Sequence, residues 1–200
     1  MLLKEYRLHN WRKHGLDLYT HHTHLLSHTL YVLIFIFTGN LLSVFCIMFT
    51  REESSRIREE FWTTFGKYMS PILSAEGINI NWVNYHTRLK DVHFRMDAGK
   101  QSATISISME HRDPDIQELY FDQFQELKTL LHDTLQEEWE WQLHHPASDG
   151  KVVSRIYKEI SGVSVFSKDH WPELISFFKP RIIALDSFWE DAKYSFEGLR

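Results

Sequence analysis

Three carboxylates beside predicted strands are the side chains best placed for metal-dependent chemistry. Asp91 and Asp97 border one alternating stretch, and Glu110 ends the next one in the sequence Glu110-His111-Arg112. Carboxylate oxygens bind Mg²⁺, and a lysine beside them can polarise a water molecule for hydrolysis. Arginine stands at position 112 instead, and its guanidinium stays fully charged and cannot shuttle a proton. We therefore favour solvent-facing acids at strand ends, predict no metal site, and keep catalysis by these acids as an alternative.

Arginine and aromatic residues on predicted strands indicate a surface for binding. Arg155 and Tyr157 share one face of an alternating stretch from Val152 to Ile160, and Arg95 lies in the polar phase of an earlier stretch. Trp and Arg together are enriched where proteins contact their partners. Most tryptophans in this chain fall on the apolar phase of their elements, which predicts core packing for them. Arg155, Tyr157 and Arg95 are therefore the predicted binding residues.

Composition and charge narrow the possible functions. The chain has 200 residues, of which 43% are apolar and 14% aromatic, so it can fold around a packed core. A single cysteine, Cys46, excludes disulfides within the chain and cysteine-based zinc sites. The first 47 residues carry four basic and two acidic side chains, and the total net charge is −5, so the remainder carries −7. A negative domain is poorly suited to non-specific binding of a phosphate backbone.

A capped helix is the first element expected to position these residues. Thr50 and Glu53 form a capping box that starts this helix near Arg51. Its apolar residues recur at steps of three and four as far as Met69, and Pro71 then stops it. The helix therefore marks the beginning of the folded region.

Alternating stretches follow this helix and predict an antiparallel sheet with one buried and one polar face. The first three stretches lie at residues 78–83, 92–97 and 103–110. Asp113 and Pro114 start a second helix, which runs to about Gln136. Two more strands and a long helix are expected at residues 139–143, at 152–160 and after Asp169. We therefore predict an α+β fold with a sheet of about five strands, in the order helix-βββ-helix-ββ-helix, packed by helices.

Residues 1–47 are expected to form an N-terminal extension, separate from a single α+β domain at residues 48–200. No Asp, Glu, Lys or Arg occurs between Asp17 and Arg51, and residues 30–49 form a hydrophobic segment long enough to cross a bilayer as a helix. Two hypotheses stay open. Either this segment is a transmembrane anchor that holds the domain at the cytoplasmic face of a membrane, or translation begins at Met48 and the domain is simply cytoplasmic. The capped helix that starts two residues after Met48 favours the second hypothesis.

Six motifs in the expected domain are distinctive beyond their periodicity. They are FTREESSRIREEFW at 49–62, INWVNY at 80–85, VHFRMD at 92–97, WEW at 139–141, SRI at 154–156 and FFKPRIIAL at 177–185. With these motifs, the stretch from Phe49 to Phe196 resembles a bacterial family described as domain of unknown function 4268, and most of all its short Bacteroidetes-type members. Those members begin at a Met that corresponds to Met48. Similar domains follow restriction-nuclease-like domains in longer proteins, so the resemblance implies an accessory module beside DNA processing or defence.

Together these observations favour a non-catalytic binding or accessory module without a cofactor. We expect it to contact a protein or nucleic-acid partner through the polar sheet face and Arg155. The predicted order of helix, three strands, helix and strand also occurs in restriction-type nucleases with a PD-(D/E)xK core. One alternative is therefore a divergent nuclease that binds Mg²⁺ through Asp91 or Asp97 together with Glu110. The other alternative is a membrane-anchored domain on the cytoplasmic face, which requires residues 1–47.

Overall fold

The computed structural model describes residues 50–147 and 150–199 of the chain. The hydrophobic segment expected at residues 30–49 and the boundary at Met48 lie outside the described residues, so both stay predictions. Among the helices that the structure describes, none is both long enough and apolar enough to span a membrane.

The first described helix, α2 (Arg51–Met69), has the bounds that the sequence predicts. The Glu53 amide donates to Thr50 Oγ1 at 3.2 Å, and the Thr50 amide donates to Glu53 Oε2 at 2.9 Å. These two bonds satisfy N–H groups that have no partner within the helix. The hydrogen bonds from Thr50 also hold the pKa of Glu53 below its usual value. The predicted capping box is therefore confirmed.

The strand predicted at residues 78–83 is wrong. Residues 70–91 are all described and contain no strand. Asn81 Oδ1 accepts hydrogen bonds from the amides of Val83 and Asn84, both at 3.1 Å. Side-chain turns of this kind occupy N–H groups that a strand would offer to its neighbour. Trp82 is nevertheless buried, and its indole N–H donates to Ile72 O at 3.0 Å, so the apolar alternation reflects a packed loop.

The sheet among the described residues has four strands, not the five predicted, and every pair is antiparallel in the order β1-β2-β4-β3. The strands are β1 (Val92–Ala98), β2 (Ser102–Met109), β3 (Glu140–Pro146) and β4 (Val152–Ser161). Each corresponds to one of the other four predicted strands. The α+β class is therefore confirmed, and the observed order is helix, two strands, two helices, two strands and helix.

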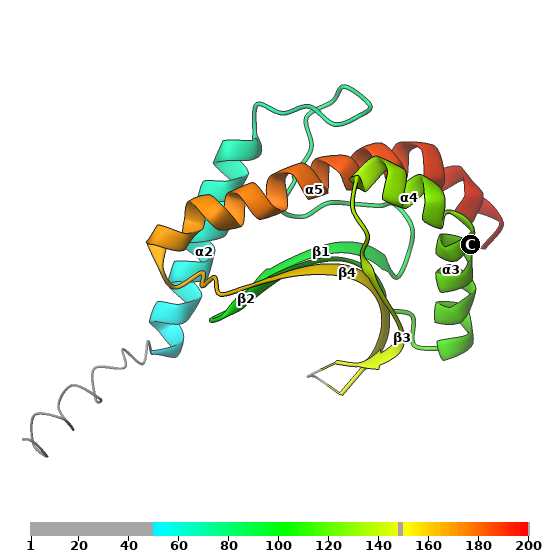
Figure 1. Cartoon of the computed structure of the whole chain (residues 1–200), viewed down its shortest axis with the longest axis horizontal. Coiled ribbons are helices and arrows are strands. Elements are labelled where there is room, and N and C mark those ends of the chain that lie inside the picture. The colour runs from blue at the N-terminus through cyan, green and yellow to red at the C-terminus, as the bar shows by residue number, and fades with distance from the viewer. Residues whose placement is uncertain (1–49, 148–149, 200) are drawn as a thin grey trace, which may run out of the picture. The chain divides into compact units, whose positions relative to one another are not determined.

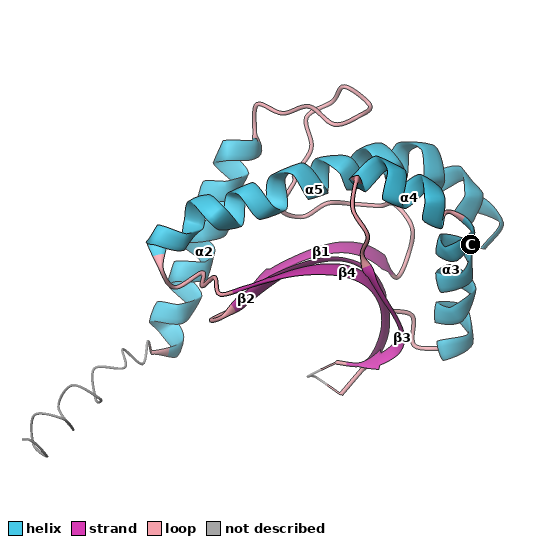
Figure 2. Cartoon of the chain, in the orientation of Figure 1, coloured by secondary structure: helices cyan, strands magenta, loops and turns pink. Residues whose placement is uncertain are grey.

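Three helices lie on the outer side of the strongly curved sheet (Figure 2). They are α3 (Pro114–Glu126), α4 (Lys128–Leu135) and α5 (Trp171–Ala192). The helix α3 packs on β2, β3 and β4, whereas α5 packs on β1 and β2, and α4 lies beside α5 (Figure 1). Short 3-10 helices precede and follow α5 as η1 (Lys168–His170) and η2 (Lys193–Leu199).

The single helix predicted from Asp113 to Gln136 is interrupted at Leu127. The Leu127 amide bonds to Phe124 O at 3.1 Å, three residues back, which tightens the last turn of α3. The chain then turns into α4. The predicted start is confirmed, because Asp113 Oδ1 accepts the Asp115 amide at 3.1 Å.

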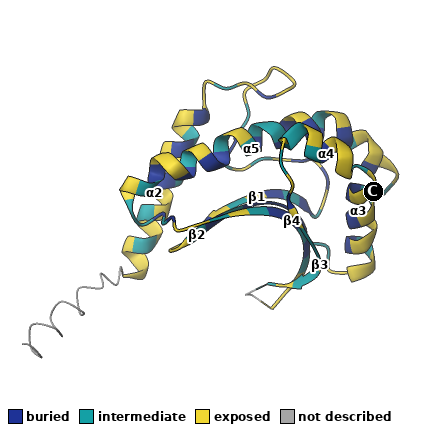
Figure 3. Cartoon of the chain, in the orientation of Figure 1, coloured by how far each residue is buried: buried dark blue, intermediate teal, exposed yellow. Residues whose placement is uncertain are grey.

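The core lies between these helices and the outer face of the sheet, where Figure 3 shows the buried residues of α5 and the strands. The helix α2 joins this core through aromatic rings. Phe61 and Phe65 are fully buried, and the ring of Phe178 in α5 lies 6.5 Å and 6.1 Å from theirs. The last helix therefore connects α2 to the sheet.

An ion pair connects α5 to the segment before β3. Arg181 binds Glu137 through two parallel hydrogen bonds, from Nε to Oε1 at 2.8 Å and from Nη2 to Oε2 at 2.7 Å. The indole N–H of Trp139 also donates to Glu137 Oε1 at 2.8 Å. Burial works against the charge, but the bonds from Arg181 and Trp139 outweigh it and hold the pKa of Glu137 below its usual value.

Replacing Glu137 with glutamine is expected to lower the free energy of unfolding at neutral pH by about 1–2 kcal/mol. The folded-state pKa lies below the unfolded value of about 4.3, so the carboxylate stabilises the fold above that pH. This contribution is lost as the pH falls through the folded-state pKa. Urea unfolding from about pH 7 to about pH 3 should show the two proteins converging at the acidic end. A difference that stays constant over this range would contradict the ionic contribution.

Candidate functional site

The four strands point one set of polar side chains away from the helices. Directly paired residues of an antiparallel sheet point to the same face. Ser106 of β2 pairs with both Arg95 of β1 and Tyr157 of β4, and Gln142 of β3 pairs with Arg155. The sheet curves away from its helices, so this face is the concave one (Figure 1). The polar face consists of His93, Arg95, Asp97, Thr104, Ser106, Ser108, Glu140, Gln142, Arg155, Tyr157 and Glu159.

The centre of the polar face is sunken. Ser106, Ser108 and Tyr157 are each less than a tenth exposed, at 9%, 8% and 8%. The two serine hydroxyls lie 3.1 Å apart and hydrogen-bond to each other. By register, Ser106 lies between Arg95 and Tyr157, and Ser108 lies beside Arg155. The two serines and Tyr157 therefore form a buried floor, and longer, more exposed side chains such as Arg95 and Arg155 surround it.

Arg155 is held in one orientation by a chain of polar contacts. Its Cζ lies 4.3 Å from the centroid of the Tyr157 ring, and its Nε donates to Gln142 Oε1 at 2.8 Å. Gln142 Nε2 donates in turn to the Tyr157 hydroxyl at 3.2 Å, and that hydroxyl donates to Glu140 Oε2 at 2.6 Å. The bond to Glu140, together with burial, raises the pKa of Tyr157. The phenol therefore keeps its proton, and the ring stays fixed under the guanidinium.

The two arginines of the polar face differ in how many hydrogen-bond donors they leave available to a ligand. Arg95 uses Nε and Nη2 to bind both oxygens of Glu110, at 2.9 Å and 3.0 Å. Arg155 donates only through Nε. Among the described residues, none accepts a hydrogen bond from its two terminal nitrogens, and no carboxylate lies within ion-pair distance of its guanidinium. The terminal donors of Arg155 are therefore open to a ligand.

The catalytic alternative pairs Asp91 or Asp97 with Glu110, and the structure brings only Asp91 beside Glu110. Asp91 and Glu110 lie opposite each other, where the Glu110 amide donates to Asp91 O at 2.7 Å. Asp97 lies six residues further along β1, which is about 20 Å away at the rise of a strand. The Asp91 carboxylate lies 3.9 Å from His111 Nε2, and Glu110 is held by Arg95. Within the part of the chain that the structure describes, no group of three or more His, Cys, Asp or Glu side chains is arranged to hold a metal ion.

Comparison with known proteins assigns the chain to a family. A family model described as domain of unknown function (DUF4268) matches residues 57–193. The chain belongs to this family. The match confirms the resemblance seen in the sequence motifs, and the DUF4268 range includes every residue of the polar face. No curated protein and no solved structure matches the chain. Because the DUF4268 description names no reaction, the implied link to DNA processing or defence stays a prediction.

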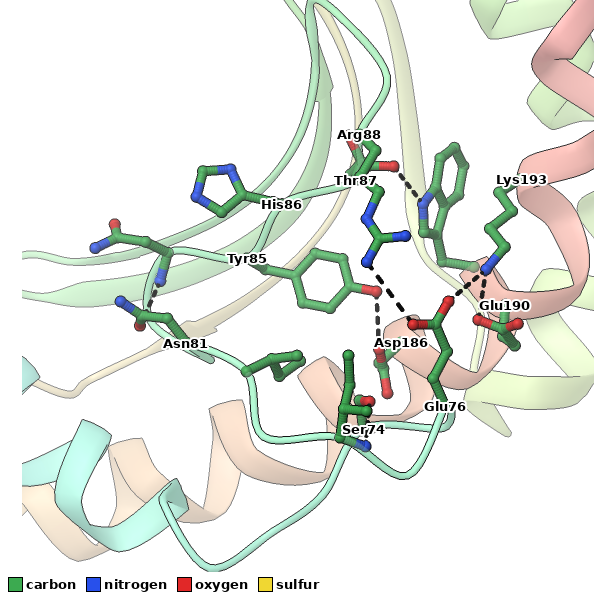
Figure 4. A pocket seen from close by; sticks show the side chains of 14 residues that line it. Ser74, Glu76, Asn81, Tyr85, His86, Thr87, Arg88, Asp186, Glu190 and Lys193 are labelled. Carbon is green, nitrogen blue, oxygen red and sulfur yellow. Dashed lines mark hydrogen bonds and ion pairs between the residues drawn. The ribbon is translucent and has the colours of Figure 1, made fainter.

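A second site of the DUF4268 domain was not predicted from the sequence. A cavity of about 340 Å³ lies between residues 74–88 and the C-terminal half of α5 (Figure 4). Asp186 lines it and is only 6% exposed. Its Oδ1 accepts the Tyr85 hydroxyl at 2.8 Å, and its Oδ2 accepts the Ala75 amide at 2.6 Å. Burial and the bond to Asp186 raise the pKa of Tyr85 far above its ordinary value, so the hydroxyl stays protonated.

A row of charged side chains borders the same cavity (Figure 4). Lys193 Nζ lies 2.8 Å from Glu76 Oε1 and 2.7 Å from Glu190 Oε2. Arg88 Nη2 lies 3.8 Å from the other oxygen of Glu76. Hydrogen bonds to Glu190 and Glu76 raise the pKa of Lys193, and the bond from Lys193 lowers the pKa of Glu76. The two basic and two acidic side chains therefore pair with one another and largely neutralise each other's charge.

One signal in the sequence could have indicated this cavity. Asp186 stands among the buried residues Ile182, Leu185 and Trp189, on the apolar phase of α5. A carboxylate at such a position needs a partner in the interior. Its partner, Tyr85, is 101 residues away, so no local pattern connects the two.

Proposed function

We propose that the DUF4268 domain is a non-catalytic binding module whose polar face holds an anionic group of a protein partner at Arg155. The orientation of Arg155 carries this proposal. A guanidinium fork binds a carboxylate or phosphate through two parallel hydrogen bonds. Here Tyr157 and Gln142 already fix the guanidinium and leave both terminal nitrogens open, so little side-chain freedom is lost on binding.

The charges around Arg155 favour a single anionic group over a polyanion. Asp97, Glu140 and Glu159 belong to the same face, and the chain after residue 47 carries −7. A nucleic-acid backbone would be repelled by these carboxylates, and its binding depends on clustered Lys and Arg. A single guanidinium is enough to bind an acidic side chain or the C-terminal carboxylate of a protein. A link to DNA processing or defence would then act through the partner protein.

Two observations support binding over the nuclease alternative. The observed order of elements lacks the first of the three strands on which that alternative depended. Of the two acids that could act with Glu110, Asp97 lies about 20 Å away along the strand, and Asp91 lies opposite a Glu110 whose carboxylate is already bound by Arg95. The membrane-anchored alternative concerns residues 1–47 and is compatible with the same binding face.

Replacing Arg155 with alanine is expected to weaken partner binding at least about 30-fold, because the interaction loses a charged, bidentate donor. The partner would be captured with the tagged full chain from its native host, identified by mass spectrometry, purified, and titrated by calorimetry. Arg95→Ala is the matched control, since Glu110 already occupies that arginine, and it should change affinity less than about threefold. Arg155→Lys should not restore binding, because an ammonium lacks the fork.

Two results would overturn the proposal. The first is a protein partner that binds Arg155→Ala as tightly as the wild-type chain. The second is capture of nucleic acid whose affinity falls steeply with salt and depends on no single arginine.

A further inference from the structure

The cavity beside α5 has the size and walls of a small-molecule site. Its volume of about 340 Å³ lies within the range of roughly 300–1,000 Å³ typical of ligand pockets. Ile78, Ile80 and Trp189 give it apolar walls, and Tyr85 and Asp186 give it polar groups that point toward one another in Figure 4. A mixed lining of this kind can bury an apolar body and orient one polar group.

The lining carries one negative charge without a counter-ion. Lys193, Arg88, Glu76 and Glu190 contribute two positive and two negative charges, and they pair with one another. Asp186 adds a third carboxylate. Within the described residues, no Lys, Arg or His lies within ion-pair distance of it, and the groups that bond to it are a phenol and an amide.

Asp186 still has hydrogen-bonding capacity. An ionised carboxylate offers about four lone-pair sites, of which Tyr85 and Ala75 occupy two. A carboxylate removed from water without a cation is costly, and a positive group in the cavity would offset that cost. The ring of Tyr85 is stacked on Phe94 at 5.0 Å and 21°, so it is already fixed beside the carboxylate.

From this arrangement we propose that the cavity binds a small organic cation. Its ammonium or guanidinium group lies against Asp186, and its apolar body lies against Ile78, Ile80 and Trp189. The cavity shares no residue with the polar face, so this site and the binding of a partner at Arg155 can be tested independently.

Benzylammonium is a suitable probe because it joins a cation to a compact aromatic body. In a ¹H–¹⁵N NMR titration of the full chain, it should shift the Ala75 amide and the Trp189 indole resonance saturably. Benzyl alcohol and benzoate have the same body with a neutral and a negative group. Benzyl alcohol should bind at least about tenfold more weakly, and benzoate should not bind. Equal binding of the alcohol and the ammonium, or no saturable shift with the ammonium, would overturn the proposal.

Two variants of the carboxylate–phenol pair sharpen the test. Asp186→Asn should weaken benzylammonium binding at least about tenfold, and Asp191→Asn, an exposed acid on the same helix, should leave it unchanged. Tyr85→Phe keeps the ring but removes a donor from Asp186, so it should bind the cation as tightly as the wild type or more tightly. Weaker binding by Tyr85→Phe, or an equal loss in both asparagine variants, would contradict a direct contact with Asp186. If Asp186→Asn does not fold, Tyr85→Phe and the three probes decide the question.

Discussion

Replacing Phe178 with alanine is expected to lower the free energy of unfolding by about 3–5 kcal/mol, because it leaves a cavity in a closely packed aromatic cluster. The side chain is fully buried, and its ring centroid lies 5.4 Å from Trp62 and 6.1 Å from Phe65, both in α2. The helix α2 packs on α5 through this cluster. The substitution should therefore loosen α2 more than it loosens the sheet.

Urea unfolding would measure the total loss, and hydrogen exchange of α2 amides would show where it occurs. Leu119→Ala is the matched control, because Leu119 is apolar but 44% exposed on α3. It should cost less than about 1 kcal/mol. A cost for Phe178→Ala no greater than that of Leu119→Ala, or uniform loss of protection across α2 and the sheet, would contradict this account of how α2 is held.

The elements predicted correctly are those whose signals lie within a few residues. The Thr50–Glu53 capping box fixes the start of α2, and the alternation in 152–160 gives β4 with Arg155 and Tyr157 on one face. Residues 78–83 alternate in the same way, yet Asn81 turns its own backbone and the segment packs as a loop. The spacing of apolar residues is the same in the two segments, so it cannot distinguish them. The difference comes from the hydrogen bonds that the Asn81 side chain makes to the backbone that follows it.

The break between α3 and α4 shows a different limit. The apolar period continues through Leu127 without glycine or proline, so the sequence predicts one helix. The structure places α3 on the sheet and α4 beside α5. Two packing surfaces in different directions therefore divide the helix, and neither surface can be known from the local sequence.

The candidate sites likewise combine features that the local sequence predicts with features that depend on distant residues. Period-two alternation is enough to place Arg95, Arg155 and Tyr157 on a polar face. Gln142 and Glu140 complete the setting of Arg155, but their contribution depends on the register of β3 against β4, which includes a bulge between Gln142 and His145. The sequence can therefore identify which arginine lies on the sheet, but not which arginine keeps its donors open.

The segment from Ile72 to Arg88 has no regular structure, and side-chain bonds to α5 hold it in place. Asp186 binds the Ala75 amide and the Tyr85 hydroxyl, and the Trp189 indole donates to Thr87 O at 2.9 Å. Two adjacent turns of one helix thus fix a loop that forms one wall of the cavity. These bonds hold one wall of the cavity against α5. Removing them one at a time therefore measures how strongly that wall is held.

Asp186→Ala is expected to lower the free energy of unfolding by about 2–4 kcal/mol. The substitution leaves the half-buried Tyr85 hydroxyl and the Ala75 amide without this acceptor, and losing the partner of a buried polar group costs about 1–3 kcal/mol. Asp191→Ala removes an exposed carboxylate from the same helix and should cost less than about 0.5 kcal/mol. Thermal and urea unfolding of the two variants would measure the difference, and equal losses would contradict the structural role of Asp186.

A double-mutant cycle separates the Tyr85–Asp186 bond from the other effects of each substitution. Tyr85→Phe alone removes one donor from Asp186, whereas in the Asp186→Ala background the same change removes a hydroxyl that already has no partner. Tyr85→Phe should therefore cost about 1–2 kcal/mol in the wild-type chain and close to nothing, or a slight gain, in the variant. The difference is the coupling energy of a bond between residues 101 positions apart. Strict additivity would mean that the Tyr85–Asp186 bond adds no stability, and that packing together with the bonds to the Ala75 amide and Thr87 O holds the loop.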